Sequence, residues 1–130
     1  MTCPECGGRE LVFPVPDRLA DYLPDDRPYA ALCEDCLHVA PEDEGPADLP
    51  DFQQIHDVFP ADPEAAAAIA CLLAVLDSLV LYRQEADALA TVAETSGADV
   101  MLVLDRLAHD PEIDPWFDLD RRAGQLEQLI

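Results

Sequence analysis

Two cysteine pairs constrain the fold of this chain more than any other feature of its sequence. Cys3 and Cys6 form one C-x-x-C motif, and Cys33 and Cys36 form a second one after 26 intervening residues. Each motif supplies two thiolates from one tight turn, and a tetrahedral metal ion needs four such soft ligands. The spacing therefore predicts a zinc ribbon over residues 1–42, in which Cys3, Cys6, Cys33 and Cys36 bind one structural Zn²⁺ ion.

Four thiolates suit iron as well as zinc. A redox iron site of this kind would usually have aromatic side chains close to the sulfurs, and only Phe13 and Tyr29 are placed to provide them. We therefore expect zinc, with an iron electron carrier as a less favoured alternative. A catalytic zinc is disfavoured because four thiolates leave no coordination position for water.

The two motifs differ in the residue that follows the second cysteine. Gly7 follows Cys6 and allows the backbone to curl past the metal, so that amide groups point at the thiolates. Leu37 takes the equivalent place after Cys36. We expect the same ligands but a looser turn at the second motif.

The chain is strongly acidic, with 28 Asp and Glu residues against 7 basic residues and a formal net charge of −21. All seven basic residues are arginine, and the acids are dispersed, with 11 before residue 45 and 17 after it. An even acidic coat on an apolar core suits a protein in concentrated salt, where screening over ~3 Å at 1 M weakens self-repulsion. An ordinary acidic protein of low-salt conditions is the alternative.

The sequence favours a cytoplasmic location. Residues 1–20 lack the basic start and apolar run of a secretory signal, so we expect reduced thiols rather than disulfides. The apolar run 65–82 is largely alanine and is interrupted by Asp77 and Ser78, which favours a buried helix over a membrane span.

Nucleic acid, a common partner of zinc ribbons, is disfavoured by charge. The ribbon carries only three basic residues, Arg9, Arg18 and Arg27. Phosphate contacts need Lys or Arg, and affinity for phosphate falls as salt rises. A nucleic-acid-associated transcriptional regulator is therefore the less favoured, alternative function.

The pattern of apolar residues and of helix-breaking residues predicts an α+β fold. Short β-hairpins in a ribbon (1–42) precede an acidic, Pro-rich linker with a short helix (43–61), and a helical domain (62–130) forms an all-α up-and-down bundle with one long helix. The expected elements are strands at 11–13 and 30–32, a helical turn within 17–26, and helices at 51–58, 63–96 (either continuous or kinked near Arg83), 99–109 and from 114 onward. Asp62-Pro63 and Asp114-Pro115 each combine an N-cap with a proline suited to the first helical turn.

The remaining residues with reactive side chains do not form a catalytic pattern. Cys71 lies in an apolar segment and is expected in the core, with a redox or catalytic thiol as the less favoured alternative. His38 is expected on a strand surface, with a spare metal ligand as the alternative, and His56 and His109 have no partner at ligand spacing. Asp77 is expected either to pair with an arginine such as Arg83 or Arg106 or to face solvent through a gap. Since no phosphate loop, nucleophile motif or paired-carboxylate site is present, we expect the protein not to be an enzyme.

Two sets of motifs resemble known families. Cys3-Pro4-Glu5-Cys6-Gly7 resembles the C-P-x-C-G motif of haloarchaeal small zinc-finger proteins. With Leu81-Tyr82-Arg83 and the segment 103–108 (VLDRLA), the chain more closely resembles a domain-of-unknown-function family with an N-terminal zinc ribbon and a helical C-terminal part. The resemblance implies a cytoplasmic zinc-binding protein of undefined role and transfers no catalytic residues.

We expect a non-enzymatic zinc-ribbon adaptor that works as a protein-interaction module in a halophilic cytoplasm. The partner would be another protein or a second copy of the chain, bound through the helical domain. Residues spaced by three and four at the end of the chain form a candidate seam for the second copy, namely Trp116, Leu119, Ala123, Leu126 and Ile130.

Overall fold

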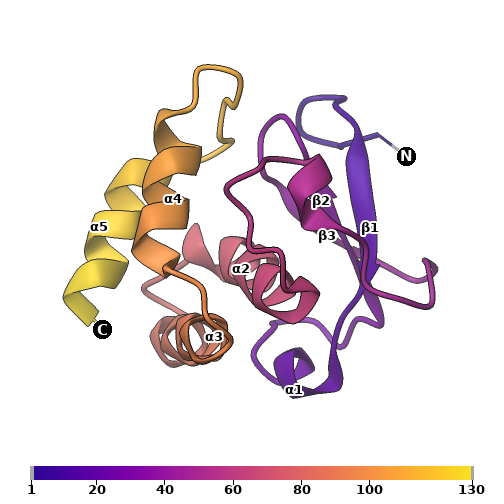
Figure 1. Cartoon of the computed structure of the whole chain (residues 1–130), viewed down its shortest axis with the longest axis horizontal. Helices are drawn as coiled ribbons and strands as arrows, with labels where there is room; N and C mark the ends of the chain where they lie inside the picture. Colours follow the sequence, from indigo (N-terminus) through magenta and orange to yellow (C-terminus); the bar gives the residue numbers. More distant parts are fainter. Residues whose placement is uncertain (1, 130) are drawn as a thin grey trace.

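A three-stranded antiparallel sheet forms the N-terminal part of the chain in the computed structural model, which describes residues 2–129 (Figure 1). Strands β1 (Glu10–Pro14), β2 (Tyr29–Cys33) and β3 (Val39–Glu42) lie in the order β1-β2-β3. The first two strands match the apolar segments expected from the sequence. The third lies within the predicted ribbon but was not assigned to a specific segment.

Two short helical turns lie in the connections, one between β1 and β2 and a 3₁₀ turn between the sheet and the first long helix. Helix α1 (Asp17–Ala20) buries Leu19, in agreement with the helical turn expected within 17–26. The helix expected at 51–58 is only a 3₁₀ turn, η1 (Phe52–Gln54). Phe52 and Phe59 are almost completely buried, and Phe52 packs edge-on against Phe13 of β1 with 5.1 Å between ring centroids. Packing of these rings, rather than a longer helix, fixes the linker to the sheet.

Four helices follow the linker. They are α2 (Pro63–Leu76), α3 (Arg83–Thr95), α4 (Val100–His109) and α5 (Leu119–Leu129). Asp62 and Asp99 cap α2 and α4 through hydrogen bonds from the amides of Glu64 and Leu102, as the sequence indicates. The sheet followed by helices confirms the predicted α+β fold.

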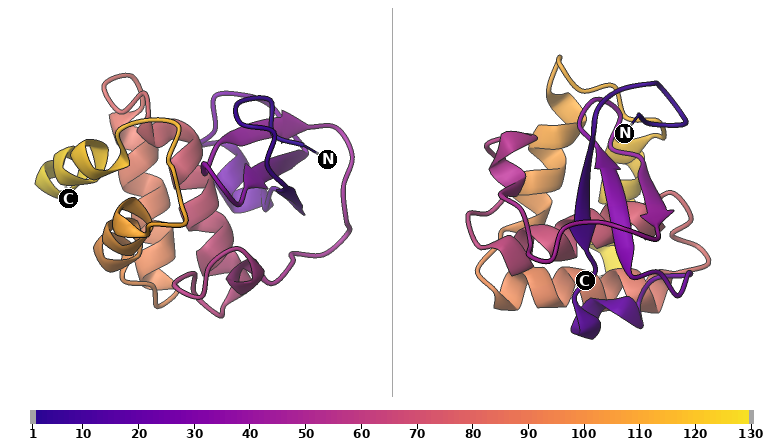
Figure 2. Two further views of the ribbon diagram at one scale, coloured as in Figure 1. Left: turned by 90° about the horizontal axis from the view of Figure 1, so that it is seen from above. Right: turned by 90° about the vertical axis from the view of Figure 1, so that its right-hand side faces the viewer.

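The prediction of one long helix over 63–96 is wrong. The chain leaves the helix at Asp77 and re-enters it at Arg83, so α2 and α3 form a helical hairpin (Figure 2). A continuous helix of this length would extend about 51 Å and would leave the apolar surface of α2 uncovered. Eleven of the fourteen residues of α2 are buried, and the hairpin allows α3, α5, β3 and η1 to pack around it. Asp77, expected to pair with an arginine or to face solvent, is half-buried at the turn and accepts a hydrogen bond from the hydroxyl of Ser78.

The last helix also differs from its prediction. It begins at Leu119 rather than near Asp114, because Asp118 serves as the cap and accepts a hydrogen bond from the amide of Arg121 at 3.2 Å. Residues 110–118 form a loop, and Trp116 lies in this loop instead of on the inner face of the helix.

Sheet, linker and helices share one hydrophobic core. Buried side chains from β1 and β2, from the linker and from all four long helices belong to a single continuous cluster. The sheet lies on one side of α2, and α4 and α5 lie on the other (Figure 1). None of the helices in the described chain has the length and apolar character that crossing a bilayer requires.

Candidate metal centre

The first cysteine motif forms a tight hairpin turn ahead of β1. The amide of Gly7 donates to the carbonyl of Cys3 at 2.9 Å, and the amide of Cys3 donates to the carbonyl of Gly8 at 2.8 Å. Gly7 has a φ of 77°, in the left-handed region that glycine enters without steric cost. The turn is closed by an isolated bridge between Thr2 and Arg9. We call residues 3–8 the first knuckle.

The second motif, residues 33–38, forms the turn between β2 and β3 and has the same hydrogen bonds. The amide of Leu37 donates to the carbonyl of Cys33 at 3.1 Å, and the amide of Cys33 donates to the carbonyl of His38 at 2.9 Å. Leu37 takes the place of Gly7 and adopts a φ of 63°. The expected loosening of this second knuckle is therefore not observed, because Leu37 accepts the left-handed conformation while its side chain is fully buried in the main core.

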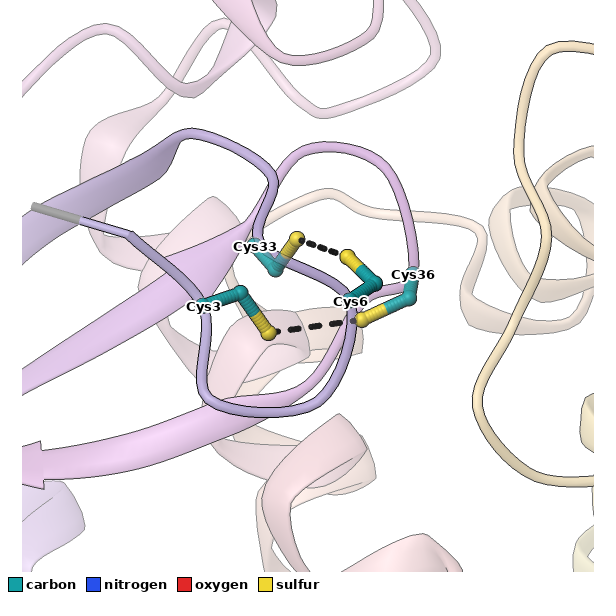
Figure 3. Close-up of side chains that lie close together, drawn as sticks. All are labelled: Cys3, Cys6, Cys33 and Cys36. Atoms are coloured by element: carbon teal, nitrogen blue, oxygen red, sulfur yellow. Dashed lines mark hydrogen bonds between the residues drawn. The ribbon is translucent and has the colours of Figure 1, made fainter.

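The four cysteines predicted as ligands come together from the two knuckles (Figure 3). Two sulfur pairs join the knuckles, with 3.6 Å between Cys3 and Cys36 and 3.5 Å between Cys6 and Cys33. All four sulfurs lie within 4.8 Å of one another. Four Zn–S bonds of about 2.3 Å in a tetrahedron would place the sulfurs about 3.8 Å apart. The spacing fits a shared ion and exceeds the roughly 2.05 Å of a disulfide.

Backbone amides point at the sulfurs from within the knuckles. The amides of Glu5, Gly8 and Asp35 donate to the sulfurs of Cys3, Cys6 and Cys33, each at 3.4 Å. Such hydrogen bonds stabilise thiolates and orient metal ligands. Cys6 is exposed to solvent, whereas Cys3, Cys33 and Cys36 are buried.

The surroundings of the sulfurs set their proton affinity. Burial raises the pKa of Cys33 to about 11 and also raises the pKa of Cys36. At Cys3 burial acts in the same direction, but amide hydrogen bonds from Cys6 and Glu5 and contacts with the other thiols outweigh it, and the pKa falls below its usual value. Because metals bind thiolates, an incoming cation must displace protons from these thiols. The set can bind a metal ion, and with four sulfurs it leaves no ligand position for a substrate.

The other residues weighed from the sequence lie outside this cluster. Cys71 is completely buried in α2, and burial raises the pKa of its thiol to about 12, which makes it unreactive. His56 pairs with Asp110, and its other ring nitrogen accepts from the amide of Val58 at 3.0 Å, so both nitrogens are used structurally.

His109 does have partners that its sequence position does not reveal. Its Nδ1 lies 2.8 Å from the carbonyl oxygen of Asp105, and its Nε2 lies 3.6 Å from a carboxylate oxygen of Asp120. The hydrogen bond to the Asp105 carbonyl and the charge of Asp120 raise the pKa of His109. The three side chains are exposed, and the imidazole lies between the two carboxylates.

The contacts around the second knuckle were not predicted from the sequence. The loop between α4 and α5 lies against this knuckle, and Trp116 packs edge-on against His38 with 5.0 Å between ring centroids. His38, expected on a strand surface, is therefore partly covered. The only signal in the sequence is the single tryptophan of the chain, which periodicity assigned to a helix.

The fold and the site define a protein with two cysteine knuckles on a small sheet that is packed against a helical part. The profile of the Family of unknown function (DUF6276) matches residues 2–130, and the chain belongs to this family. No curated protein matches the sequence, and no solved structure matches it either.

Proposed function

We propose that this protein is a non-enzymatic adaptor of a salt-rich cytoplasm whose two knuckles are held together by one structural zinc ion. The observation that carries this proposal is the cluster of four sulfurs. Four thiolates occupy all four coordination positions of a tetrahedral ion and leave none for a reacting water. The zinc would join the first knuckle to the second through the four sulfurs. Its contribution would be to folding, and the function would then reside on the surface of the folded chain.

The strongest candidate for a protein-binding surface lies where α2 and α5 end and α3 begins. Val80 and Leu81 in the turn between α2 and α3 are 69% and 75% exposed, and Leu129 at the end of α5 is 42% exposed. The turn projects beside the end of α5 (Figure 2), and the two border a hollow of about 320 Å³. We call this surface the turn patch; it consists of Leu79, Val80, Leu81, Arg83, Gln125, Gln128 and Leu129.

The charge of the turn patch indicates the kind of partner. Residues 78–84 contain one arginine and no acid, in a chain with a net charge of −21. Within residues 2–129, Arg83 makes no ion pair. A partner surface with apolar side chains and a carboxylate facing Arg83 would suit this patch. The rest of this molecule is acidic and would repel that carboxylate. The seam considered for a second copy is less suitable, because Leu119, Ala123 and Leu126 are buried within the chain itself.

The arginines of the ribbon lend no support to the nucleic-acid alternative. Arg9 lies 3.8 Å from Glu34, Arg18 lies 2.9 Å from Glu64, and Arg27 is buried beside Asp25. Their charges are thus offset by carboxylates before any phosphate approaches. A titration of DNA binding against KCl tests this alternative, and tight binding in molar salt that is lost on changing Arg9 and Arg18 would favour it.

Metal analysis tests the first half of the proposal. We expect one zinc per chain in reduced, purified protein, a colourless solution, and loss of the ion in the Cys36→Ser variant but not in Cys71→Ser. Red-brown absorbance with stoichiometric iron would contradict the adaptor proposal and favour the alternative function as an electron carrier. Protein without any stoichiometric metal would remove the basis of the proposal.

A matched pair of variants tests the second half. Leu81→Asp places a charge in the turn patch, and Leu102→Asp places one at another exposed leucine, on α4, that is 45% exposed. Affinity capture from an extract of the source organism in high salt should yield a stoichiometric protein partner with wild type and with Leu102→Asp, and lose it with Leu81→Asp. Equal capture by both variants would rule out the turn patch as the contact.

A further inference from the structure

The loop between α4 and α5 is bonded directly to the main chain of the second knuckle. The amide of Asp114 donates to the carbonyl of Asp35 at 2.9 Å, and the amide of Trp116 donates to the carbonyl of Cys36 at 3.1 Å. Both acceptors belong to the C-x-x-C turn itself. Residues distant in sequence thus contact the backbone that carries two of the four sulfurs.

Side chains reinforce these two bonds. Trp116 packs edge-on against His38, and Phe117 packs edge-on against Trp116 with 5.5 Å between ring centroids. Ile113 is 8% exposed and belongs to the main core. At the start of the loop, Asp110 is paired with His56 of the linker. The loop is therefore held at its start by the linker and along its length by the knuckle.

The directions of the Asp35 and Cys36 carbonyls depend on the conformation of the knuckle. That conformation has a left-handed residue, Leu37, and is sterically unfavourable for a free chain. An ion bound to Cys33 and Cys36 would fix both ends of the turn. Its loss would release the sulfurs and allow the two carbonyls to turn away from the loop.

We propose that residues 114–116 are an outer shell of the metal centre, which positions the second knuckle for ion binding and is itself ordered when the ion binds. This inference rests on the proposed metal site and adds a regulatory link between that site and the helical part. Coupling of this kind is reciprocal: the ion orders the loop by the same factor by which the loop strengthens ion binding. The state of the cysteines is thereby transmitted to the start of α5.

The single tryptophan allows a direct test, because all tryptophan emission comes from Trp116. Removing zinc with a chelator should shift the emission to longer wavelength as the indole leaves His38, and adding zinc back should reverse the shift. Emission that stays unchanged while metal analysis reports complete loss of zinc would overturn the inference. A protein that never binds zinc would instead overturn the proposed function, so the two failures are distinguishable.

Zinc affinity provides the second readout, measured by competition with a chromophoric chelator on the full chain. Asp114→Pro removes one hydrogen-bond donor to the knuckle and should weaken zinc binding about fivefold, the usual effect of one net hydrogen bond. Trp116→Ala removes the contact with His38, should weaken binding in the same direction, and serves if Asp114→Pro does not fold. Asp99→Ala destabilises α4 without touching the knuckle and is the matched control. Equal zinc affinity for Trp116→Ala and this control would refute the inference.

Discussion

Leu37 provides the sharpest test of the knuckle geometry. It combines a left-handed backbone, with a φ of 63°, and a side chain that is fully buried in the main core. The two features oppose each other when the residue is shortened. Leu37→Ala removes the buried side chain but keeps the strained backbone, whereas Leu37→Gly removes both.

The expected magnitudes follow from these two features. Replacing a buried leucine by alanine costs about 2–5 kcal/mol of the free energy of unfolding. A left-handed backbone costs a residue with a Cβ atom about 1–2 kcal/mol relative to glycine. Replacing alanine by glycine would relieve this strain, but the larger conformational freedom of glycine in the unfolded chain offsets about 0.4–1 kcal/mol of the relief. Leu37→Gly should therefore be destabilised relative to wild type, yet be as stable as Leu37→Ala or more stable by about 1 kcal/mol.

Leu32 is the matched control, since it is also fully buried but lies in the regular strand β2. There glycine should be less stable than alanine by about 0.5–1 kcal/mol. Urea unfolding followed by circular dichroism, with excess zinc and a fixed salt concentration, gives the four free energies. If glycine were worse than alanine by the same amount at both positions, the assignment of backbone strain to Leu37 would be incorrect.

Three further outcomes are expected. Chelation of the metal should lower the melting temperature in calorimetry, and readdition of zinc should restore it; an unchanged transition would mean that the ion, if bound, does not support the fold. Because burial raises the pKa of Cys71 from 9.0 to about 12, the folded chain keeps a proton that the unfolded chain loses. The free energy of unfolding should thus decline between those pH values, and less so in Cys71→Ala, as urea titrations at several pH values would reveal. Asp99→Ala removes the cap that accepts from the amide of Leu102 and should cost about 1 kcal/mol, whereas Asp87→Ala on the exposed face of α3 should leave the urea midpoint nearly unchanged.

The sequence predicted those features that depend on local chemistry. The cysteine spacing indicated which sulfurs meet, and the caps at Asp62 and Asp99 located the starts of α2 and α4. The helical turn at α1 followed from apolar spacing between prolines. Each of these depends on interactions between residues close in sequence or on a motif with one strong structural requirement.

The features that the sequence did not predict depend on competition between distant parts of the chain. The break at Asp77 arises because α2 is apolar on every side and must be covered by several elements, a requirement invisible within a local window. Asp114 and Asp118 are both suitable caps, and the bonds from 114–116 to the second knuckle favour the later one. A tertiary contact thus decides between two equivalent local signals.

The unequal exposure of the four cysteines predicts the order in which they exchange a metal ion. Thiolates around an ion are exchanged one at a time, and an incoming acceptor can reach only a sulfur that solvent already touches. Cys6 is an exposed residue, whereas Cys3, Cys33 and Cys36 are buried. We therefore expect Cys6, in the first knuckle, to be the first ligand that is exchanged when a metal ion is bound or released. The cysteines of the second knuckle would be exchanged last.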